Sequence, residues 1–396
     1  MKTIYADNAA TTQMSRTAID AILQYMDTEY GNPSSLHAMG QRAAEALQSA
    51  RESVAQQLGC APCEIYFTSG GSEANNQAIL SAVAIGKSKG KKHIISTAFE
   101  HHAVLHVLKK LERNGFEITL LDVHKNGILL PQELEDALRE DTCLVTVMYA
   151  NNEIGTLQPI SKIAEICRQH SVIFHTDAVQ AAGHVPIDVK RQHIDMLSLS
   201  AHKFHGPKGV GALYVRQGIK LETLIEGGAQ ERGKRGGTEN IPAIMGMAAA
   251  FYDACSRMEK QERKLITLRN RLIDALGTIP HSVLNGDKTS RLPGNVSFCF
   301  EGIEGEALLL LLNQQGICAS SGSACTSGAL EPSHVLLAIG HPHEVAHGSL
   351  RLTLSDLNTE DDITHIIHTV PRVVAHLRSM SPLWKDMQEG KKAHVI

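Results

Sequence analysis

Short apolar runs alternate with longer helix-like stretches along the first part of this chain. The apolar runs cover 65–68, 93–96, 116–121, 143–148, 172–175, 196–200 and 211–215, and the helix-like stretches cover 73–83 (with Ser72 as its cap), 103–113, 131–139 and 160–170. Alternation of this kind predicts an α/β fold with a mostly parallel central sheet wrapped by helices. Ligands in such sheets bind just beyond the carboxyl ends of the strands, so residues that directly follow the strands are the first candidates for a site.

The pattern changes near residue 250. A long charged helix is expected over 247–275, strands over 295–300 and 351–354, and helices over 304–313 and 361–378. A chain of 396 residues exceeds the size at which a single core usually stops growing, so two domains are expected. We predict a large domain over 15–255 and a smaller α+β domain formed by 1–14 and 256–396. The polar tail over 381–396 is expected to be mobile.

Composition argues against several classes of protein. The net charge of -4 and the lack of a long basic run argue against a nucleic-acid-binding protein. The sequence contains no run of 18 apolar residues, which a membrane span would need. The first seven residues lack the apolar stretch of a signal peptide. A cytoplasmic protein is therefore expected, in which the eight cysteines are thiols.

Lys203 follows the apolar run 196–200 and has small and polar neighbours. Desolvation at such a position would lower the pKa of the amine and make it a nucleophile. The alternative is a solvated loop lysine, and Lys208 in the turn 206–209 is a rival for the same role.

Three further features follow predicted strands. Asp177 could pair with a protonated pyridine nitrogen, which keeps the ring an electron sink, or it could cap a helix. Gln180 could reach a ring hydroxyl or lie on the surface. The glycine turn over 69–72 comes before a helix and could bind phosphate through its amides. His101 could stack on a flat ring or shuttle protons, although most histidines do neither.

Cys325 lies in a run of Gly, Ser, Ala and Thr residues over 319–328. Such a run offers little apolar surface to bury a thiol, so a reactive role is favoured for this cysteine. The pair Cys60 and Cys63 could be a redox pair or half a metal site, but a turn with two incidental thiols is the preferred interpretation. Chance also explains the three histidines within 341–347 best, and we expect no metal site.

Taken together, these motifs resemble the aminotransferase class V family of pyridoxal-phosphate enzymes, which have fold type I. The resemblance is closest to the group I cysteine desulfurases of the NifS/IscS type. The motifs that carry it lie, in order, at 5–12, 31–35, 68–76, 174–180, 196–203, 235–240 and 320–328, followed by Arg351.

The resemblance implies pyridoxal 5'-phosphate as the cofactor, with Lys203 holding it as a Schiff base. It further implies that His101 stacks on the ring, Asp177 holds the ring nitrogen, Gln180 holds the phenolic oxygen, and Gly71, Ser72, Ser200 and His202 bind the phosphate. Thr238 would reach the phosphate of a partner subunit, which implies a homodimer. Asn152 and Arg351 would bind the substrate carboxylate, for which the arginine fork is well suited.

The implied activity converts L-cysteine to L-alanine. Lys203 would take the Cα proton, His101 would donate or accept a proton, and Cys325 would keep the sulfur as a persulfide for an acceptor protein such as an iron–sulfur scaffold. The alternatives are a selenocysteine lyase, another class V enzyme such as an aminotransferase, and a non-enzymatic persulfide carrier. An aminotransferase needs no loop cysteine, and a carrier needs neither Lys203 nor Asp177.

Overall fold

The computed structural model describes residues 2–322 and 332–396. Its central feature is a seven-stranded sheet in the order β2-β8-β7-β6-β5-β3-β4. The strands are β2 (Ile65–Thr68), β3 (His93–Thr97), β4 (Glu117–Leu121), β5 (Thr142–Thr146), β6 (Ile173–Asp177), β7 (Met196–Ser200) and β8 (Gly211–Val215). Every strand of this sheet except β8 runs in the same direction. The α/β class and the mostly parallel sheet predicted from the alternating pattern are therefore confirmed.

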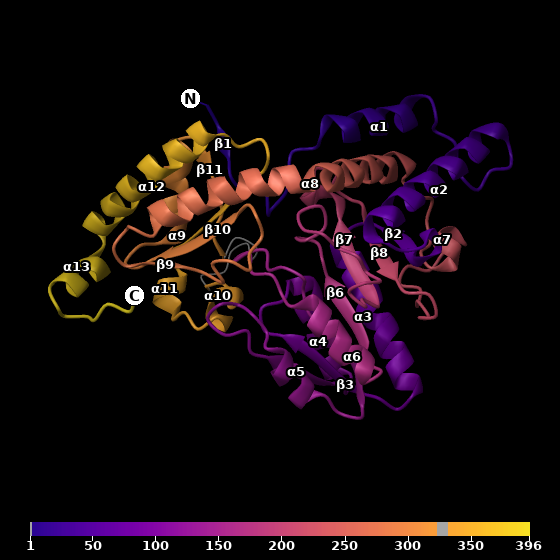
Figure 1. Ribbon diagram of the computed structural model, residues 1–396, viewed down its shortest axis with the longest axis horizontal. Helices are drawn as coiled ribbons and strands as arrows, with labels where there is room; N and C mark the ends of the chain where they lie inside the picture. Colours follow the sequence, from indigo (N-terminus) through magenta and orange to yellow (C-terminus); the bar gives the residue numbers. More distant parts are fainter. Residues whose placement is uncertain (1, 323–331) are drawn as a thin grey trace.

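Helices cover this sheet (Figure 1). They are α2 (Ala38–Leu58), α3 (Gly71–Ser88), α4 (His102–Arg113), α5 (Pro131–Ala137) and α6 (Ile160–Gln169), with short turns η1 (Pro62–Glu64), η2 (Ala201–Lys203) and α7 (Gln230–Gly233) between strands. Helix α3 packs across the middle of the sheet, against β5 and β7. The helix can pack closely against these strands because its buried face contains the small residues Ala74, Ala78 and Ala82.

A second set of strands forms the smaller part of the molecule. Its three-stranded antiparallel sheet has the order β12-β10-β9, and β1 pairs in parallel with β11. The strands are β1 (Ile4–Tyr5), β9 (Ser282–Leu284), β10 (Asn295–Phe300), β11 (Ile317–Cys318) and β12 (Ser349–Thr353). The helices are α9 (Gly305–Gln314), α10 (His334–Ala338), α11 (His343–Ala346), α12 (Glu360–Met380) and α13 (Pro382–Gln388).

Helix α8 (Ile241–Leu276) runs between the two parts (Figure 1). Its first half, from Ala243 to Ala254, packs in the core of the large sheet. Its second half, from Leu265 to Leu276, packs in the core of the small sheet. The domain boundary predicted at 255/256 falls inside this helix and stays a prediction.

Several local expectations differ from the structure. Ser72 does not cap α3, because the helix begins at Gly71 and its N-cap is Gly70, with a φ of 150° that favours glycine. Helix α8 begins six residues earlier than expected, where the Asn240 side chain accepts a hydrogen bond from the Ala243 amide over 3.2 Å. Helices α1 (Arg16–Asp27) and α2 were not predicted at all.

The tail that was expected to be mobile is instead partly helical. Its first residues form α13, with Ser381 as the N-cap. Its last residues return to the small sheet, where the Val395 amide donates to Glu301 Oε1 over 2.6 Å.

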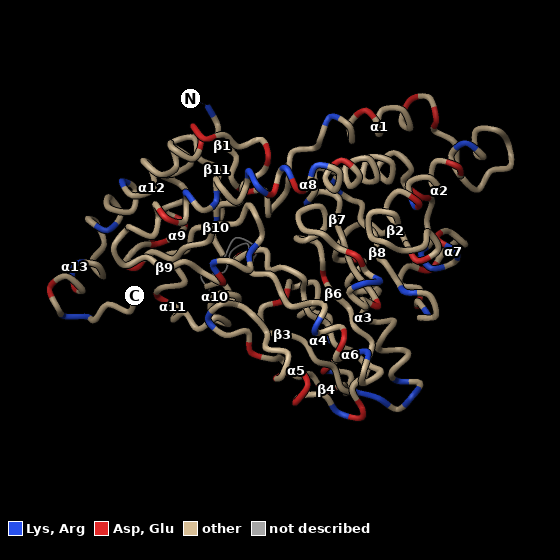
Figure 2. Tube along the Cα trace, in the orientation of Figure 1, with Lys and Arg blue, Asp and Glu red and all other residues tan. Residues whose placement is uncertain are grey.

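Positions of positively and negatively charged residues are interspersed along the chain trace (Figure 2). No helix in the described residues is both long enough and apolar enough to cross a bilayer.

A buried ion pair fixes the segment around α7 to the large sheet. Arg51 on α2 donates to both carboxylate oxygens of Glu231, over 2.8 and 2.7 Å, and the two side chains are 7% and 2% exposed. Glu231 also accepts from the Phe67 amide of β2 over 2.9 Å. We expect Arg51→Met to lower the free energy of unfolding by about 3–5 kcal/mol, because a buried carboxylate is left without its counter-charge.

Denaturant unfolding would measure this loss. The matched control is Arg42→Met on the same helix, whose pair with Glu29 is much more exposed. That change should cost no more than about 1 kcal/mol. Equal effects of the two substitutions would contradict the assignment of Arg51 as the anchor of this segment.

Candidate active site

A cavity of about 460 Å³ lies between the carboxyl ends of the central strands and the small sheet. The sequence-predicted residues that line it are Gly71, Ser72, His101, Asn152, Asp177, Gln180, Ser200, His202, Lys203 and Arg351. Of the other two, Thr238 is exposed and does not line this cavity, and Cys325 lies outside the described residues. The residues that follow the strands, chosen because parallel sheets bind ligands at the carboxyl ends of their strands, therefore line the same cavity.

Lys203 enters the cavity from η2, directly after β7. Its Nζ donates to the carbonyl oxygens of Ala9 and Ala10, over 2.7 and 2.8 Å. The amino-terminal segment is held in this position by Thr353 of β12, whose Oγ1 accepts from the Ala9 amide over 2.8 Å. Lys203 therefore contacts a segment that belongs to the smaller part of the molecule. The rival Lys208 is exposed and does not line the cavity.

Asp177 ends β6 and is only 4% exposed. Its Oδ2 accepts from Asn75 Nδ2 over 2.6 Å, and its Oδ1 accepts from the Val179 amide over 3.0 Å. Both of these donors are neutral amides. A buried carboxylate held by neutral donors would be stabilised further by the charge of a protonated pyridine nitrogen, so the site fits a pyridoxal ring. Asp177 caps no helix, so the alternative role proposed for it is wrong.

Of the four residues predicted to bind the phosphate, Gly71 and Ser72 lie at the start of α3, Ser200 ends β7 and His202 lies in η2. The first amides of a helix have no partner within the helix and, with the helix dipole, attract anions. A side chain at Gly71 would place its Cβ 2.6 Å from Val179 Cγ2, so only glycine fits there. Ser200 lies opposite, at 3.6 Å from the same Cβ position. Together these positions form a narrow space lined by polar groups, which suits a phosphate.

Two histidines of the cavity are set in defined states by their surroundings. Burial, with the nearby charges of Lys203 and Lys208, lowers the pKa of His202 to about 4, so its ring is neutral at pH 7. His101 is the N-cap of α4, and its Nδ1 accepts from the Ala103 amide over 3.1 Å. Because Nδ1 accepts this bond, the ring proton is on Nε2, which makes that atom the available hydrogen-bond donor.

Arg351 reaches the cavity from β12 of the small sheet. Its Nη2 lies 2.9 Å from Asp7 Oδ1, and its Nη1 donates to the Asn152 carbonyl over 3.2 Å. Its Nε is buried without a hydrogen-bond partner among the described residues. An unsatisfied guanidinium donor in a cavity is suited to a carboxylate ligand.

Sequence reasoning missed several residues at this site. Asn75 contacts Asp177, and Asp7 contacts Arg351, yet neither was assigned a role. Asn75 stands one helical turn after Gly71, so its place on the same side of α3 was a usable signal. Glu100 was also missed: burial raises its pKa to about 8, and its Oε1 accepts from the Met148 amide over 2.9 Å. No signal in the sequence indicates that Asp7 and Arg351 meet.

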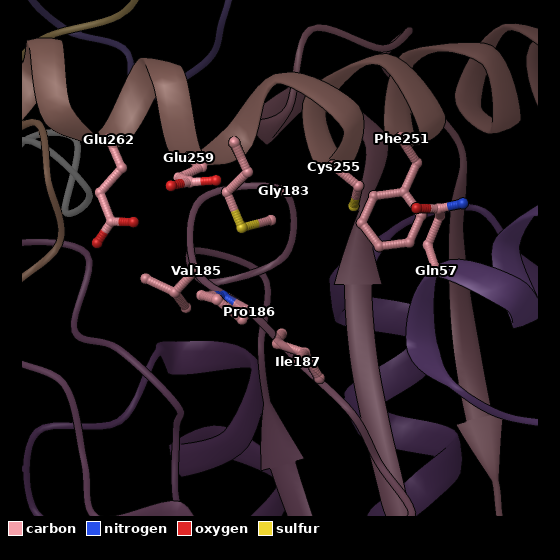
Figure 3. A pocket seen from close by; sticks show the side chains of 10 residues that line it. Gln57, Gly183, Val185, Pro186, Ile187, Phe251, Cys255, Glu259 and Glu262 are labelled. Carbon is pink, nitrogen blue, oxygen red and sulfur yellow. The ribbon is translucent and has the colours of Figure 1, made fainter.

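A second cavity, of about 480 Å³, lies beneath α8 (Figure 3). Its apolar part is formed by Val185 and Phe251, and Glu259 and Glu262 of α8 stand over it. The residues that line it include two carboxylates and no lysine or arginine, so an anionic ligand would be repelled. This cavity therefore does not fit a phosphorylated cofactor.

Comparison with known proteins agrees with the geometry of the first cavity. Residues 4–366 match the aminotransferase class-V family. The chain belongs to this family. The resemblance predicted from the spaced motifs is thereby confirmed.

Three similar proteins show how much of the chain is matched. A protein of Methanosarcina thermophila named cysteine desulfurase IscS is 53% identical over 96% of this chain and 94% of its own length. A solved NifS-like protein has a TM-score of 0.89 and 36% identity, over 95% of this chain and 100% of its own. A structure described as SspA in complex with cysteine has a TM-score of 0.79 and 35% identity, over 90% and 99% of the two chains.

Proposed function

We propose that this class-V protein is a pyridoxal-phosphate-dependent cysteine desulfurase. It would convert L-cysteine to L-alanine and pass the sulfur, held as a persulfide on Cys325, to an acceptor protein. The observation that carries the proposal is the convergence of Lys203, Asp177 and Arg351 on one cavity, in a chain about half identical to proteins named cysteine desulfurase. The relative solved with cysteine supports a small amino acid as the ligand of this cavity.

The residues of the cavity have distinct proposed tasks. Lys203 would hold the cofactor, Asp177 would stabilise its protonated ring nitrogen, Gln180 its phenolic oxygen, and the start of α3 with Ser200 and His202 its phosphate. When bound, pyridoxal phosphate supplies an electron sink for the bonds at the substrate Cα.

The protein's own groups then move protons and bind the substrate. The Lys203 amine would accept the Cα proton as the general base of the site. Nε2 of His101 donates a proton as the product forms. Arg351, with Asn152, orients the substrate carboxylate, which fixes the direction of the Cα–H bond.

Sulfur transfer is assigned to Cys325, which lies outside the described residues. Its thiolate would attack the substrate sulfur, so that an S–S bond forms and the C–S bond breaks. The electron pair of the broken bond stays on the substrate carbon, which takes a proton to become alanine. Ser320 lines the cavity at the start of the run that carries Cys325, which supports this placement.

Catalysis of this kind is tested by incubating the holoenzyme with L-cysteine and a thiol, and measuring alanine and sulfide. We expect equal amounts of alanine and transferred sulfur. Parallel assays with L-selenocysteine distinguish a desulfurase from a selenocysteine lyase. Alanine release from selenocysteine alone would overturn the proposal.

Arg351→Lys should mainly weaken substrate binding, because the second of two parallel hydrogen bonds to the carboxylate is lost. A charged hydrogen bond contributes about 1.5–3 kcal/mol, so we expect KM for L-cysteine to rise roughly 10- to 150-fold. Steady-state kinetics would measure this rise in KM. Arg372 on α12 is exposed, so Arg372→Lys is the control and should leave KM unchanged. A fall in kcat with unchanged KM would indicate that Arg351 acts only through its pair with Asp7.

We further propose that the protein is a cytoplasmic homodimer that donates sulfur for iron–sulfur cluster assembly. The exposed apolar side chains around α1 support a subunit interface, since Met26, Tyr30 and Leu36 are 64%, 73% and 92% exposed. Thr238, exposed and away from its own cavity, would then complete the phosphate site of the partner subunit. Light scattering should give the mass of a dimer. Thr238→Val should weaken cofactor binding while the protein remains a dimer.

A further inference from the structure

The chain's last residues lie against the small sheet. After α13 the backbone turns back toward β9 and α11 (Figure 1). The Lys392 ammonium pairs with Glu344 of α11, and Nδ1 of His281 lies 2.5 Å from the main-chain oxygen of Ile396. The segment over 389–396 is therefore held at several points.

Three potential metal ligands meet where this segment contacts the sheet. Nδ1 of His394 lies 2.8 Å from Glu301 Oε2, and Nδ1 of His281 lies 3.4 Å from the same oxygen. The ligand atoms of the three side chains all lie within 4.8 Å of one another. Within residues 2–322 and 332–396, no other group of histidine, cysteine and acidic side chains is clustered in this way.

Glu301 has no permanently charged partner within ion-pair distance among the described residues, although its Oε1 accepts from the Val395 amide over 2.6 Å. The Glu301 side chain is 1% exposed, and its ion-pair partners among the described residues are the two histidines, with no lysine or arginine. A buried carboxylate is costly unless a positive charge or several hydrogen bonds compensate it. A divalent ion would supply that charge while the imidazoles remain neutral.

Neighbouring residues hold the ligands in place. Arg378 donates to the main-chain oxygens of His281 and Glu301, over 2.9 Å each, and its guanidinium stacks 4.0 Å from the Trp384 ring. Trp384 in turn contacts both imidazoles, at ring-centre distances of 5.4 Å from His281 and 5.3 Å from His394. The two imidazoles stack on each other at 3.7 Å. Ligands fixed by surrounding groups in this way bind ions at lower entropic cost.

A glycine makes this packing possible. Gly302, directly after Glu301, has a φ of 80°, and a Cβ there would lie 2.6 Å from Trp384 Cε3. Any side chain at 302 would therefore push α13 away from the sheet, and the His394 segment with it.

We propose that His281, Glu301 and His394 bind a divalent transition-metal ion, with zinc the best match. Two imidazole nitrogens and one carboxylate oxygen form a ligand set typical of zinc, and nitrogen donors favour first-row transition metals over magnesium or calcium. The main-chain oxygen of Ile396, beside His281, offers a fourth ligand atom. The bound ion joins the segment over 389–396 to the residue before β9 and the residue after β10, independently of the chemistry proposed for the cavity.

The test is zinc binding by the full-length holoenzyme after chelator treatment. Equilibrium dialysis followed by metal analysis should find one zinc ion more per chain in the wild type than in His394→Ala or Glu301→Gln. The exposed His376→Ala on α12 is the matched control and should bind as the wild type does. Zinc should also raise the Tm of the wild type and of the control, but not that of the two ligand variants.

Cobalt as a probe separates this site from the thiols. A cobalt ion on imidazole and carboxylate ligands shows weak visible bands without the thiolate charge-transfer absorption, and these bands should disappear in His394→Ala. Equal zinc content in all variants would overturn the proposal. So would a loss of the ion only in Cys60→Ser/Cys63→Ser, because the thiols would then be the ligands.

Discussion

Lys203→Ala should abolish cysteine turnover and remove the visible absorbance of the lysine-bound cofactor. Two effects combine: the cofactor loses its covalent attachment, and the Cα proton loses its base. Positioned proton transfer alone is worth about 10²- to 10⁴-fold in rate, so the loss should be at least that large. Absorbance spectra and alanine release measured on the same protein sample would record both effects.

Lys208→Ala is the matched control for this experiment. Lys208 is five positions away, exposed, and does not line the cavity. It should retain both the absorbance and the activity. If Lys208→Ala instead lost the absorbance and Lys203→Ala kept it, Lys208 would be the lysine that holds the cofactor. The cofactor site would then lie at the turn 206–209.

Cys325→Ser should stop alanine release from L-cysteine while leaving cofactor binding unchanged. Serine keeps the size of the side chain but offers a hydroxyl that is essentially un-ionised near pH 7, whereas a thiol with a pKa of about 8.5 is a few per cent ionised and strongly nucleophilic. Loss of an attacking nucleophile often lowers kcat by several powers of ten, and we expect at least about 10²-fold here. The assay is alanine release with excess thiol present.

Cys63→Ser controls for general effects of removing a thiol, because Cys63 is exposed and lies apart from the cavity. Labelled sulfur from cysteine should appear on the wild type and on Cys63→Ser, and not on Cys325→Ser. Near wild-type turnover by Cys325→Ser would reject the persulfide role and leave a class-V enzyme with a different reaction.

The parts of the site that follow strands were predictable from the sequence. Lys203 and Asp177 each stand at the carboxyl end of an apolar run, and the topology of a parallel sheet brings such ends to one edge. The glycine turn before α3 was found in the same way, although Ser72 was wrongly expected as the cap. That error arose because a helix start depends on backbone angles, and Gly70 adopts a φ of 150° that the side-chain pattern does not reveal.

Contacts between distant segments were not predictable. Arg351 entered the prediction only through the family resemblance, and its partner Asp7 lies 344 positions away. The same holds for the cluster at Glu301, since His394 stands 93 positions from it and had been assigned to a mobile tail. Helices α1 and α2 were overlooked entirely.

The sequence by itself determined the order and type of most strands and helices, because hydrophobic periodicity and turn residues act over a few neighbouring positions. It also determined which side chains could carry chemistry. Only the tertiary structure decided which of them meet: Ala9 and Ala10 with Lys203, Asn75 with Asp177, Asp7 with Arg351, and His394 with Glu301. Some of these contacts form within one core and others between the two cores that α8 joins, and in each case the packing is a property of the whole chain, which no local stretch encodes.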